Sequence, residues 1–290
     1  MGVKKMITKL TEIYLTDFIE YIKKHATGYD DYFLCDEQLN LFELEDNITY
    51  IKLENDRITG VISIMKSFGI RLRILHAEDL NFDILKELHL NIMASLKQLN
   101  ISKYKVFIET KETEMIDIFK KLGLEIERTI YAFKRDIQDI IVPKLDSEYT
   151  VDVLKIPEDI KDYARIRNIA FKDLVGSDQR EVSFFIDMDK SDDYCKETTL
   201  ILRHLDKPVA IIRGAKEIED GEEQLFIGPV AVLPDYQGKG LGKYLLSQVI
   251  QTATHMKCPC FLSVNTNNES ALSLYKNLGF YEDAIVVALI

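Results

Sequence analysis

The sequence predicts an α/β protein with mixed sheets, built from two similar units in tandem. Three observations lead to this prediction. The chain has 290 residues, more than one ordinary domain of about 100 to 200 residues. Strand-like segments alternate with segments that carry apolar residues at helical spacing. The two halves of the chain also follow the same order of segments.

Both halves end with the same succession of elements. The first contains KVFIETKETEMIDIFKKLGLEIERTIYAFKRDI from Lys105, and the second contains FLSVNTNNESALSLYKNLGFYEDAIVVALI from Phe261. Each reads as a strand, a polar break, a short helix, a Leu-Gly pair and a final strand. Aligning Gly123 with Gly279 brings the two segments into register. The alignment predicts that each half is one copy of the same unit.

A hairpin of two strands and an amphipathic helix are predicted upstream of that segment in each half. Between the halves, residues 137–147 contain Pro143 and no helical stripe, so they are the predicted linker. We therefore expect domains at 1–140 and 147–290. The upstream elements are strands 48–53 and 57–65 and helix 83–99 in the first half, and strands 197–203 and 208–213 and helix 241–253 in the second.

The second half is predicted to open with a strand over 149–154 and a helix after Pro157 that runs toward Phe171. We expect another helix to begin near Gln179, with the preceding Asp178 or Ser177 as its N-cap.

An apolar run over 224–232 is interrupted by Gly228 and Pro229. Proline cannot donate a hydrogen bond to a sheet ladder, so the run predicts a strand with a bulge or a splay at that point. A splayed strand leaves backbone groups free to bind a ligand.

Charge and apolar pattern restrict the classes of partner. The formal net charge is −11, and both halves are acidic, so we expect no nucleic-acid partner. The N-terminus has no apolar signal core, and no apolar run approaches the roughly 20 residues that cross a bilayer. We expect a cytoplasmic protein that does not enter membranes. The sequence does not predict its oligomeric state.

Cysteines and histidines give no sign of a metal centre. The four cysteines do not form a disulfide scaffold in a chain of this size. His255, Cys258 and Cys260 are close in sequence, but a helix end followed by a strand would turn them apart and no fourth ligand has zinc spacing. We expect no metal.

The glycine-rich run PDYQGKGLGKYLLSQVI begins at Pro234. A Walker A loop needs four residues between its first glycine and Gly-Lys; here there are three, and Tyr244 stands where Ser or Thr is required. The dinucleotide fingerprint G-x-G-x-x-G fails because the third glycine comes one residue early.

A third pattern, Q-x-x-G-x-G, is satisfied by Gln237, Gly240 and Gly242, between an apolar strand and an amphipathic helix. Glycines let the backbone turn so that N–H groups converge, and a helix N-terminus adds about half a positive charge. Such a turn suits a pyrophosphate. A simple strand-to-helix turn remains the alternative.

These residues resemble the GNAT superfamily of N-acetyltransferases. The resemblance extends downstream to Asn268, to Tyr275 seven residues later and to Leu278-Gly279-Phe280. It covers residues 147–290 strongly and the first half only through the shared plan. It implies twisted, mostly antiparallel sheets flanked by helices.

The resemblance also implies the site. Acetyl-CoA would bind as co-substrate, with its pantetheine arm and thioester carbonyl on the splayed strand and Tyr275 as the general acid at the departing sulfur. A core position is the alternative for Tyr275. The implied coenzyme-binding residues are Val230, Ala231, Val232, Gln237, Gly238, Lys239, Gly240, Leu241, Gly242, Lys243 and Asn268.

The general base is missing from the pattern. Two places where relatives often carry a glutamate hold Phe226 and Ser263. Glu222 and Glu223 are alternatives, although charges at that point are typical of a solvated hairpin tip. The first half has Phe119 in place of the tyrosine and no glycine between residues 74 and 88, so we expect it to lack coenzyme binding.

We therefore expect an acetyl-CoA-dependent N-acetyltransferase whose acceptor is a primary amine, on a small molecule, a peptide N-terminus or a lysine. The alternative is a non-catalytic acyl-CoA-binding sensor or regulatory module.

Overall fold

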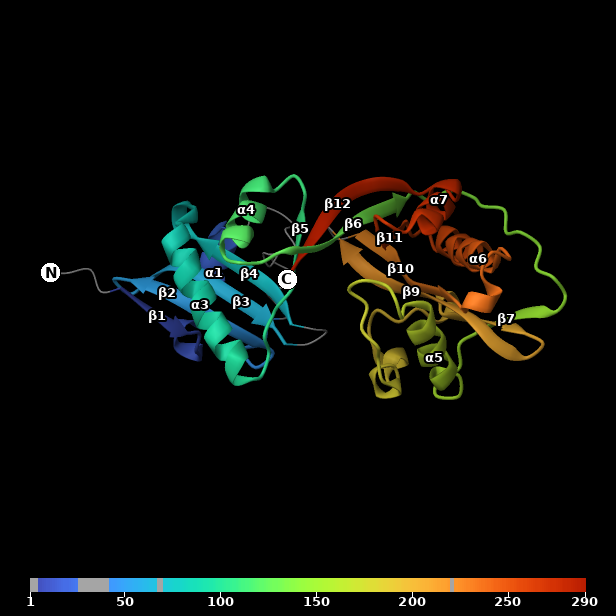
Figure 1. Ribbon diagram of the computed structural model, residues 1–290, viewed down its shortest axis with the longest axis horizontal. Helices are drawn as coiled ribbons and strands as arrows, with labels where there is room; N and C mark the ends of the chain where they lie inside the picture. Colours follow the sequence, from blue (N-terminus) through green and yellow to red (C-terminus); the bar gives the residue numbers. More distant parts are fainter. Residues whose placement is uncertain (1–4, 26–41, 67–69, 220–221) are drawn as a thin grey trace. The chain divides into compact units, whose positions relative to one another are not determined.

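The structure is a computed structural model that describes residues 5–25, 42–66, 70–219 and 222–290 (Figure 1). Contacts divide the chain into two units: unit 1 comprises Met1–Thr129 and Val286–Ile290, and unit 2 comprises Ile130–Ile285. The expected domain limits at 140 and 147 stay a prediction, because contacts do not establish which segments fold independently.

Unit 1 contains a four-stranded antiparallel sheet with the order β1-β2-β3-β4. Helices α1 and α3 cover opposite faces, because neighbouring residues of a strand point to opposite sides. Val61 packs in the cluster that contains Phe18 of α1, whereas Ile62 packs with Leu88 of α3. The elements are β1 (Lys5–Lys9), α1 (Leu15–His25), β2 (Asn47–Glu54), β3 (Arg57–Met65), β4 (Arg71–Ala77) and α3 (Phe82–Gln98), with 3-10 turns at Glu12–Tyr14 and Glu78–Leu80.

The unit continues with β5 (Val106–Glu109) and α4 (Thr113–Lys121). Strand β5 pairs antiparallel with the end of β12 (Tyr281–Leu289), from Val286 to Leu289. The final strand of the second sequence repeat thus completes unit 1, which the repeat pattern did not predict.

Unit 2 is built on the strands β6-β11-β10-β9-β8-β7 in that order. All neighbours are antiparallel except β10 and β11, which are parallel. Its described elements are β6 (Ile126–Arg135), β7 (Tyr149–Val153), α5 (Ile160–Ala170), β8 (Leu200–His204), β9 (Lys207–Glu219), β10 (Glu222–Val232), α6 (Leu241–His255), β11 (Cys260–Asn265) and α7 (Glu269–Asn277), with 3-10 turns at Val182–Phe184, Met188–Lys190, Lys196–Thr198 and Pro234–Tyr236.

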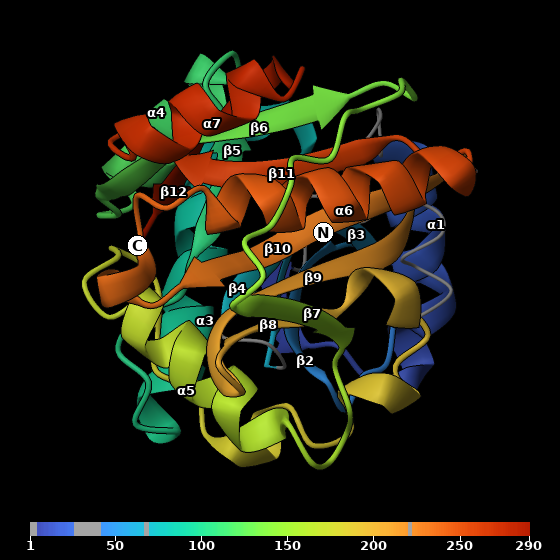
Figure 2. The ribbon, with the colours of Figure 1, turned by 90° about the vertical axis from the view of Figure 1, so that its right-hand side faces the viewer.

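Helix α5 lies on one face of this sheet, and α6 and α7 lie on the other (Figure 2). Ile211 packs in the cluster of α5, and its neighbour Ile212 packs with Leu245 of α6. The sequence prediction of a mixed α/β protein with two sheet-and-helix units is confirmed.

Two expected elements were wrong. No α-helix begins near Gln179; a 3-10 turn occupies Val182–Phe184, with Glu181 at its N-cap. The Asn168 side chain of α5 donates to Arg180 O (2.8 Å) and accepts from Arg180 N (3.0 Å). These bonds satisfy the backbone at Arg180 outside a helix. The strand expected from residue 197 begins at Leu200, because Lys196–Thr198 forms a 3-10 turn.

The predicted linker has neither helix nor strand from residue 137 to 147. Buried Arg135 donates to Leu278 O (2.8 Å), Asp136 O (3.1 Å) and Gln138 O (3.1 Å). These bonds tie the start of the linker to the end of α7. Among the residues that the structure describes, no helix has the length and apolarity to cross a lipid bilayer.

Candidate functional site

The centre of unit 2 contains an opening between two parallel strands. Strands β10 and β11 pair only at Leu225 with Cys260 and at Phe226 with Phe261. Directly afterwards, the register of β10 against β9 shifts between Ile227 and Val230, where the Gly228-Pro229 peptide is cis. The splay predicted from glycine and proline is confirmed. After Phe226, β10 remains paired with β9 along one edge, while its pairing with β11 along the other edge has ended.

Hydrogen-bond alternation shows which backbone groups face this opening. Leu233 N donates to Val209 O (2.9 Å), and paired positions alternate along an antiparallel ladder. Ala231 therefore directs its N–H and C=O toward β9, while Val230 and Val232 direct theirs toward the opening. Val232 O accepts a hydrogen bond from Gln237 Nε2 (3.0 Å). The N–H groups of Val230 and Val232 are available to a ligand there.

The glycine run forms the turn between β10 and α6. Gly238 and Gly240 have φ values of 75° and 79°, a region that costs other L-residues roughly 1 to 2 kcal/mol. Among the residues that the structure describes, no side chain caps α6 at Gly240, and the first amide of α6 with a backbone partner is that of Tyr244, which donates to Gly240 O (2.9 Å). The preceding amides, of residues 241–243, are left for another acceptor.

Positive charge accompanies these amides. Lys239 and Lys243 are exposed, and Lys239 Nζ lies 4.9 Å from the centre of the Tyr236 ring. That cation–π contact holds one ammonium beside the turn. The turn, the helix dipole and two lysines together favour an anion such as a pyrophosphate.

Asn268 and Tyr275 lie on the element that follows β11. Asn268 is the N-cap of α7: its Oδ1 accepts from Ala271 N (3.2 Å) and Ser270 Oγ (3.1 Å). Its side-chain NH₂ group is therefore the part suited to a ligand. Leu274 of α7 would lie 3.9 Å from a Cβ added at Gly242, so α7 packs close to the glycine turn.

Tyr275 is half-buried, with its ring 6.4 Å from Phe133 and 6.0 Å from Phe280 between centres. Burial raises the pKa of its hydroxyl to about 12. Within the described part of the chain, no hydrogen bond of this hydroxyl is found. Tyr275 is thus a neutral donor at pH 7.

Positions 226 and 263, on the two strands beside the opening, hold an aromatic and a hydroxyl side chain. The rings of Phe226 and Phe261 contact each other at a tilt of 49° with centres 5.1 Å apart, and Ser263 is exposed on β11. Glu223 forms an ion pair with Lys216 (2.8 Å), at the beginning of β10. It lies at the end of the strand opposite to the glycine turn. Sequence reasoning missed the aromatic pair, since two isolated phenylalanines carry no motif.

Unit 1 has different chemistry at the corresponding turn. Helix α3 is capped by Asn81, whose Oδ1 accepts from Asp83 N (3.1 Å) and Ile84 N (3.3 Å). Glu78 and Asp79 stand in the loop before it. The cap and the negative charges make this turn unsuited to an anion.

The cysteines of unit 2 are buried thiols. Burial raises the pKa of Cys258 to about 11 and that of Cys260 to about 12. Among the described residues, no group of three or more His, Cys, Asp or Glu side chains is arranged to hold a metal ion.

Part of unit 2 is similar to known acetyltransferases. Residues 163–280 match the Acetyltransferase (GNAT) family. A curated relative, the [Ribosomal protein bS18]-alanine N-acetyltransferase of Salmonella typhimurium, is 36% identical over 76 residues, which are 21% of this chain and 51% of the relative. The matched region thus spans about half the length of that relative.

Solved structures share the fold over nearly the whole chain. A GCN5-related N-acetyltransferase from Sphaerobacter thermophilus superposes with a TM-score of 0.72 at 15% sequence identity. The match covers 98% of this chain and 94% of that protein. A tandem GNAT protein from the clavulanic acid biosynthesis pathway superposes with a TM-score of 0.71 at 10% sequence identity. The match covers 99% of this chain and 98% of that protein. These likenesses establish the fold. Residues 163–280, which lie in unit 2, therefore belong to the Acetyltransferase (GNAT) family, and the chain as a whole has the fold of a tandem GNAT protein.

Proposed function

We propose that unit 2 transfers an acetyl group from acetyl-CoA to a primary amine. The observation that carries the proposal is the pairing of a strand opening with an uncapped helix N-terminus at its end. The opening offers backbone N–H groups at Val230 and Val232, and the turn offers the amides of residues 241–243.

In this proposal each group takes one part of the coenzyme. The amides of the glycine turn, with Lys239 and Lys243, hold the pyrophosphate. The backbone of Val230 and Val232 holds the pantetheine arm, and Asn268 donates to it from its NH₂ group. Gln237 acts indirectly, because its side chain fixes Val232 O. Ala231 contributes packing, since its backbone groups face β9.

The reaction is a direct attack. The amine nitrogen bonds to the thioester carbonyl carbon, and a backbone N–H of the opening donates to the developing oxyanion. The carbon–sulfur bond then breaks, the sulfur leaves as a thiolate, and water takes the surplus proton of the nitrogen. Tyr275 donates a hydrogen bond to that thiolate.

The pKa of Tyr275 decides between hydrogen bonding and full proton transfer. The hydroxyl has a pKa of about 12, and a thiol has one of about 8.5, so transfer would be uphill by about 3.5 pKa units, or about 4.8 kcal/mol. A hydrogen bond to a charged acceptor contributes about 1.5 to 3 kcal/mol without that cost. Tyr275 therefore stabilises the thiolate without giving up its proton.

The side chains at positions 226 and 263 favour an α-amino group as acceptor. At pH 7, the free energy of deprotonation is about 4.6 kcal/mol for an alkylamine of pKa near 10.4. It is only about 1.4 kcal/mol for an α-amine of pKa near 8. Phe226 and Ser263 provide no base to lower that cost. An acceptor that is already partly neutral suits this site best. The curated relative is named for an alanine of a ribosomal protein, which points to the same class.

The absence of a carboxylate at Phe226 and Ser263 also favours a second candidate function. A module that binds acyl-CoA as a sensor needs the glycine turn but no base. It would bind acetyl-CoA and show no turnover.

The test is release of free CoA from acetyl-CoA, followed with a thiol reagent across alkylamines, amino acids and peptides with free N-termini. We expect turnover with α-amine acceptors and a loss of about 10-fold to 100-fold in kcat for Tyr275→Phe, with unchanged affinity for acetyl-CoA. Tyr149→Phe, a change of the same kind on β7, should leave kcat unchanged. Tight binding without turnover across the whole panel would favour the sensor.

A further inference from the structure

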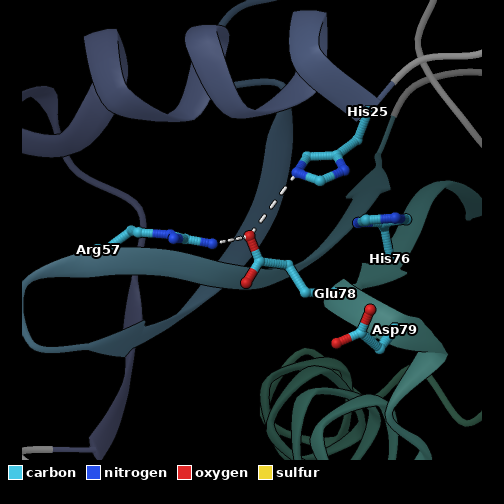
Figure 3. A pocket seen from close by; sticks show the side chains of 5 residues that line it. All are labelled: His25, Arg57, His76, Glu78 and Asp79. Atoms are coloured by element: carbon cyan, nitrogen blue, oxygen red, sulfur yellow. Dashed lines mark hydrogen bonds and ion pairs between the residues drawn. The ribbon is translucent and has the colours of Figure 1, made fainter.

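Unit 1 contains a cavity with polar lining beside the turn that precedes α3, which corresponds to the glycine turn before α6 in unit 2. The cavity has a volume of about 380 Å³ and is lined by His25, Arg57, His76, Glu78 and Asp79. These residues come from the end of α1, the β2–β3 hairpin, β4 and the turn before α3 (Figure 3). Volumes of about 300 to 1,000 Å³ are typical of small-molecule sites.

The Glu78 carboxylate is the centre of the lining. Arg57 Nη2 forms an ion pair with Glu78 Oε1 on one side. His25 Nε2 lies 3.9 Å from the same oxygen on the other, as Figure 3 shows. That separation is too long for a direct hydrogen bond. His25 Nε2 is buried and has no hydrogen-bond partner among the described residues.

The two histidines are held in place by a tyrosine. The Tyr21 hydroxyl is 2.7 Å from His76 Nδ1, and its ring centre is 4.5 Å from that of His25. The two imidazole centres are 4.7 Å apart. Burial lowers the pKa of both imidazoles, that of His76 to about 4. Both rings are therefore neutral at pH 7, and His25 can present a lone pair at Nε2.

The formal charge of the side chains that line the cavity indicates the charge of a suitable ligand. Arg57 contributes one positive charge, and Glu78 and Asp79 contribute two negative charges, so the net charge is −1. A ligand with one positive charge neutralises the cavity. No arrangement of His, Cys, Asp and Glu suited to a metal ion is found in the described ranges, so an organic cation fits better than a metal ion.

We propose that this cavity binds the primary ammonium group of a small amine. The ammonium lies in the cavity beside these two groups and donates to both Glu78 and His25 Nε2, and Asp79 supplies the second negative charge. An ammonium has three donors and no acceptor, which matches a carboxylate beside a neutral imidazole. The site lies within unit 1 and is separate from the acetyl-transfer site proposed for unit 2.

The test uses propylammonium as probe and the full chain. Histidine Cε1–H resonances are followed by NMR, with His25→Phe to assign His25; this variant keeps a ring against Tyr21 and His76. We expect propylammonium to shift the His25 and His76 resonances. Tetramethylammonium, which has the charge but no N–H donor, should not.

Variants locate the binding. Glu78→Gln should weaken the propylammonium response at His76 by about tenfold or more, since it loses a charged acceptor. Glu20→Gln makes the same charge change on the exposed part of α1 and should have no effect. Thermal unfolding and acetyl-CoA binding check that each variant is folded.

Three results would overturn the proposal: no shift with propylammonium at millimolar concentration, equal shifts with tetramethylammonium, or a response to Zn²⁺ alone. These histidine signals report on unit 1. They would stay informative if unit 2 proved to have no acetyltransferase activity.

Discussion

Gly242→Ala should stabilise the free protein and weaken its binding of acetyl-CoA. Gly242 is the second residue of α6 and has no positive φ. A Cβ at this position would lie 3.9 Å from Leu274 Cδ2 and 3.9 Å from Val232 Cγ2, which is ordinary van der Waals contact. The described neighbours of Gly242 therefore leave room for an alanine in the free protein.

The two effects have different sizes and opposite signs. Replacing a helical glycine by alanine gains about 0.5 to 1 kcal/mol, and we expect the lower value in the first turn. The melting temperature should rise by about 1 to 2 °C. The new methyl lies between β10 and α7, beside the proposed path of the coenzyme, and crowding typically costs about 1 kcal/mol or more. The Kd for acetyl-CoA should increase about fivefold or more.

Gly240→Ala is the matched contrast. Its added Cβ would meet nothing within 4 Å, but φ is 79°. It should therefore destabilise the free protein by about 1 to 2 kcal/mol through backbone strain alone. Calorimetric melting and isothermal titration with acetyl-CoA measure both quantities. A Gly242→Ala protein that binds acetyl-CoA as tightly as the wild type would refute the placement of the coenzyme beside this turn.

Three further outcomes are expected. Without a base at Phe226 or Ser263, kcat/KM for an alkylamine should rise about tenfold per pH unit between pH 7 and 9; a plateau that begins near pH 6 would reveal a base. Burial lowers the pKa of His76 to about 4, and the electrostatic effect of His25 is the second cause. Because the unfolded imidazole titrates near 6.5, stability should fall between pH 6.5 and 4 by about 1 to 2 kcal/mol after solvent screening, and His76→Gln should flatten that profile in urea unfolding. Arg135→Met should destabilise by about 2 to 4 kcal/mol, because carbonyls such as Leu278 O lose their donor; an unchanged urea midpoint would contradict this role.

The elements that sequence predicted well are those in which local pattern and tertiary packing agree. Helix α3 carries its apolar residues on one face, and the helix expected over 83–99 is found at Phe82–Gln98. The splay at Gly228-Pro229 was predictable because proline cannot pair within a ladder. The repeat predicted two similar units. It could not predict that Val286–Leu289 pairs with β5, because strand partners are chosen by long-range contacts.

The wrong helix near Gln179 shows how side chains from a distant element override local caps. Asp178 is a good N-cap by type, but its carbonyl accepts from Arg167 Nη1, and Asn168 binds the backbone of Arg180. Both partners belong to α5. No local pattern shows such contacts.

At the candidate site, the sequence pattern proposed a set of residues, and the structure shows that they differ in position. The Q-x-x-G-x-G pattern grouped Gln237 with the glycines. In the structure the Gln237 side chain donates a hydrogen bond to Val232 O. The resemblance grouped Val230, Ala231 and Val232 together, and only ladder alternation separates Ala231 from the other two. Burial raises the pKa of Tyr275. That burial is a tertiary property.

Binding of the diphosphate at the glycine turn is tested by following the backbone amide resonances of Leu241, Gly242 and Lys243 during titration with acetyl-CoA and with acetyl-pantetheine, which lacks the diphosphate. If the diphosphate binds at the start of α6, these three amides shift strongly with acetyl-CoA and only slightly with acetyl-pantetheine, which would still perturb Val230 and Val232. Equal shifts with both compounds, or acetyl-CoA binding that leaves residues 241–243 unperturbed, would contradict this placement of the diphosphate.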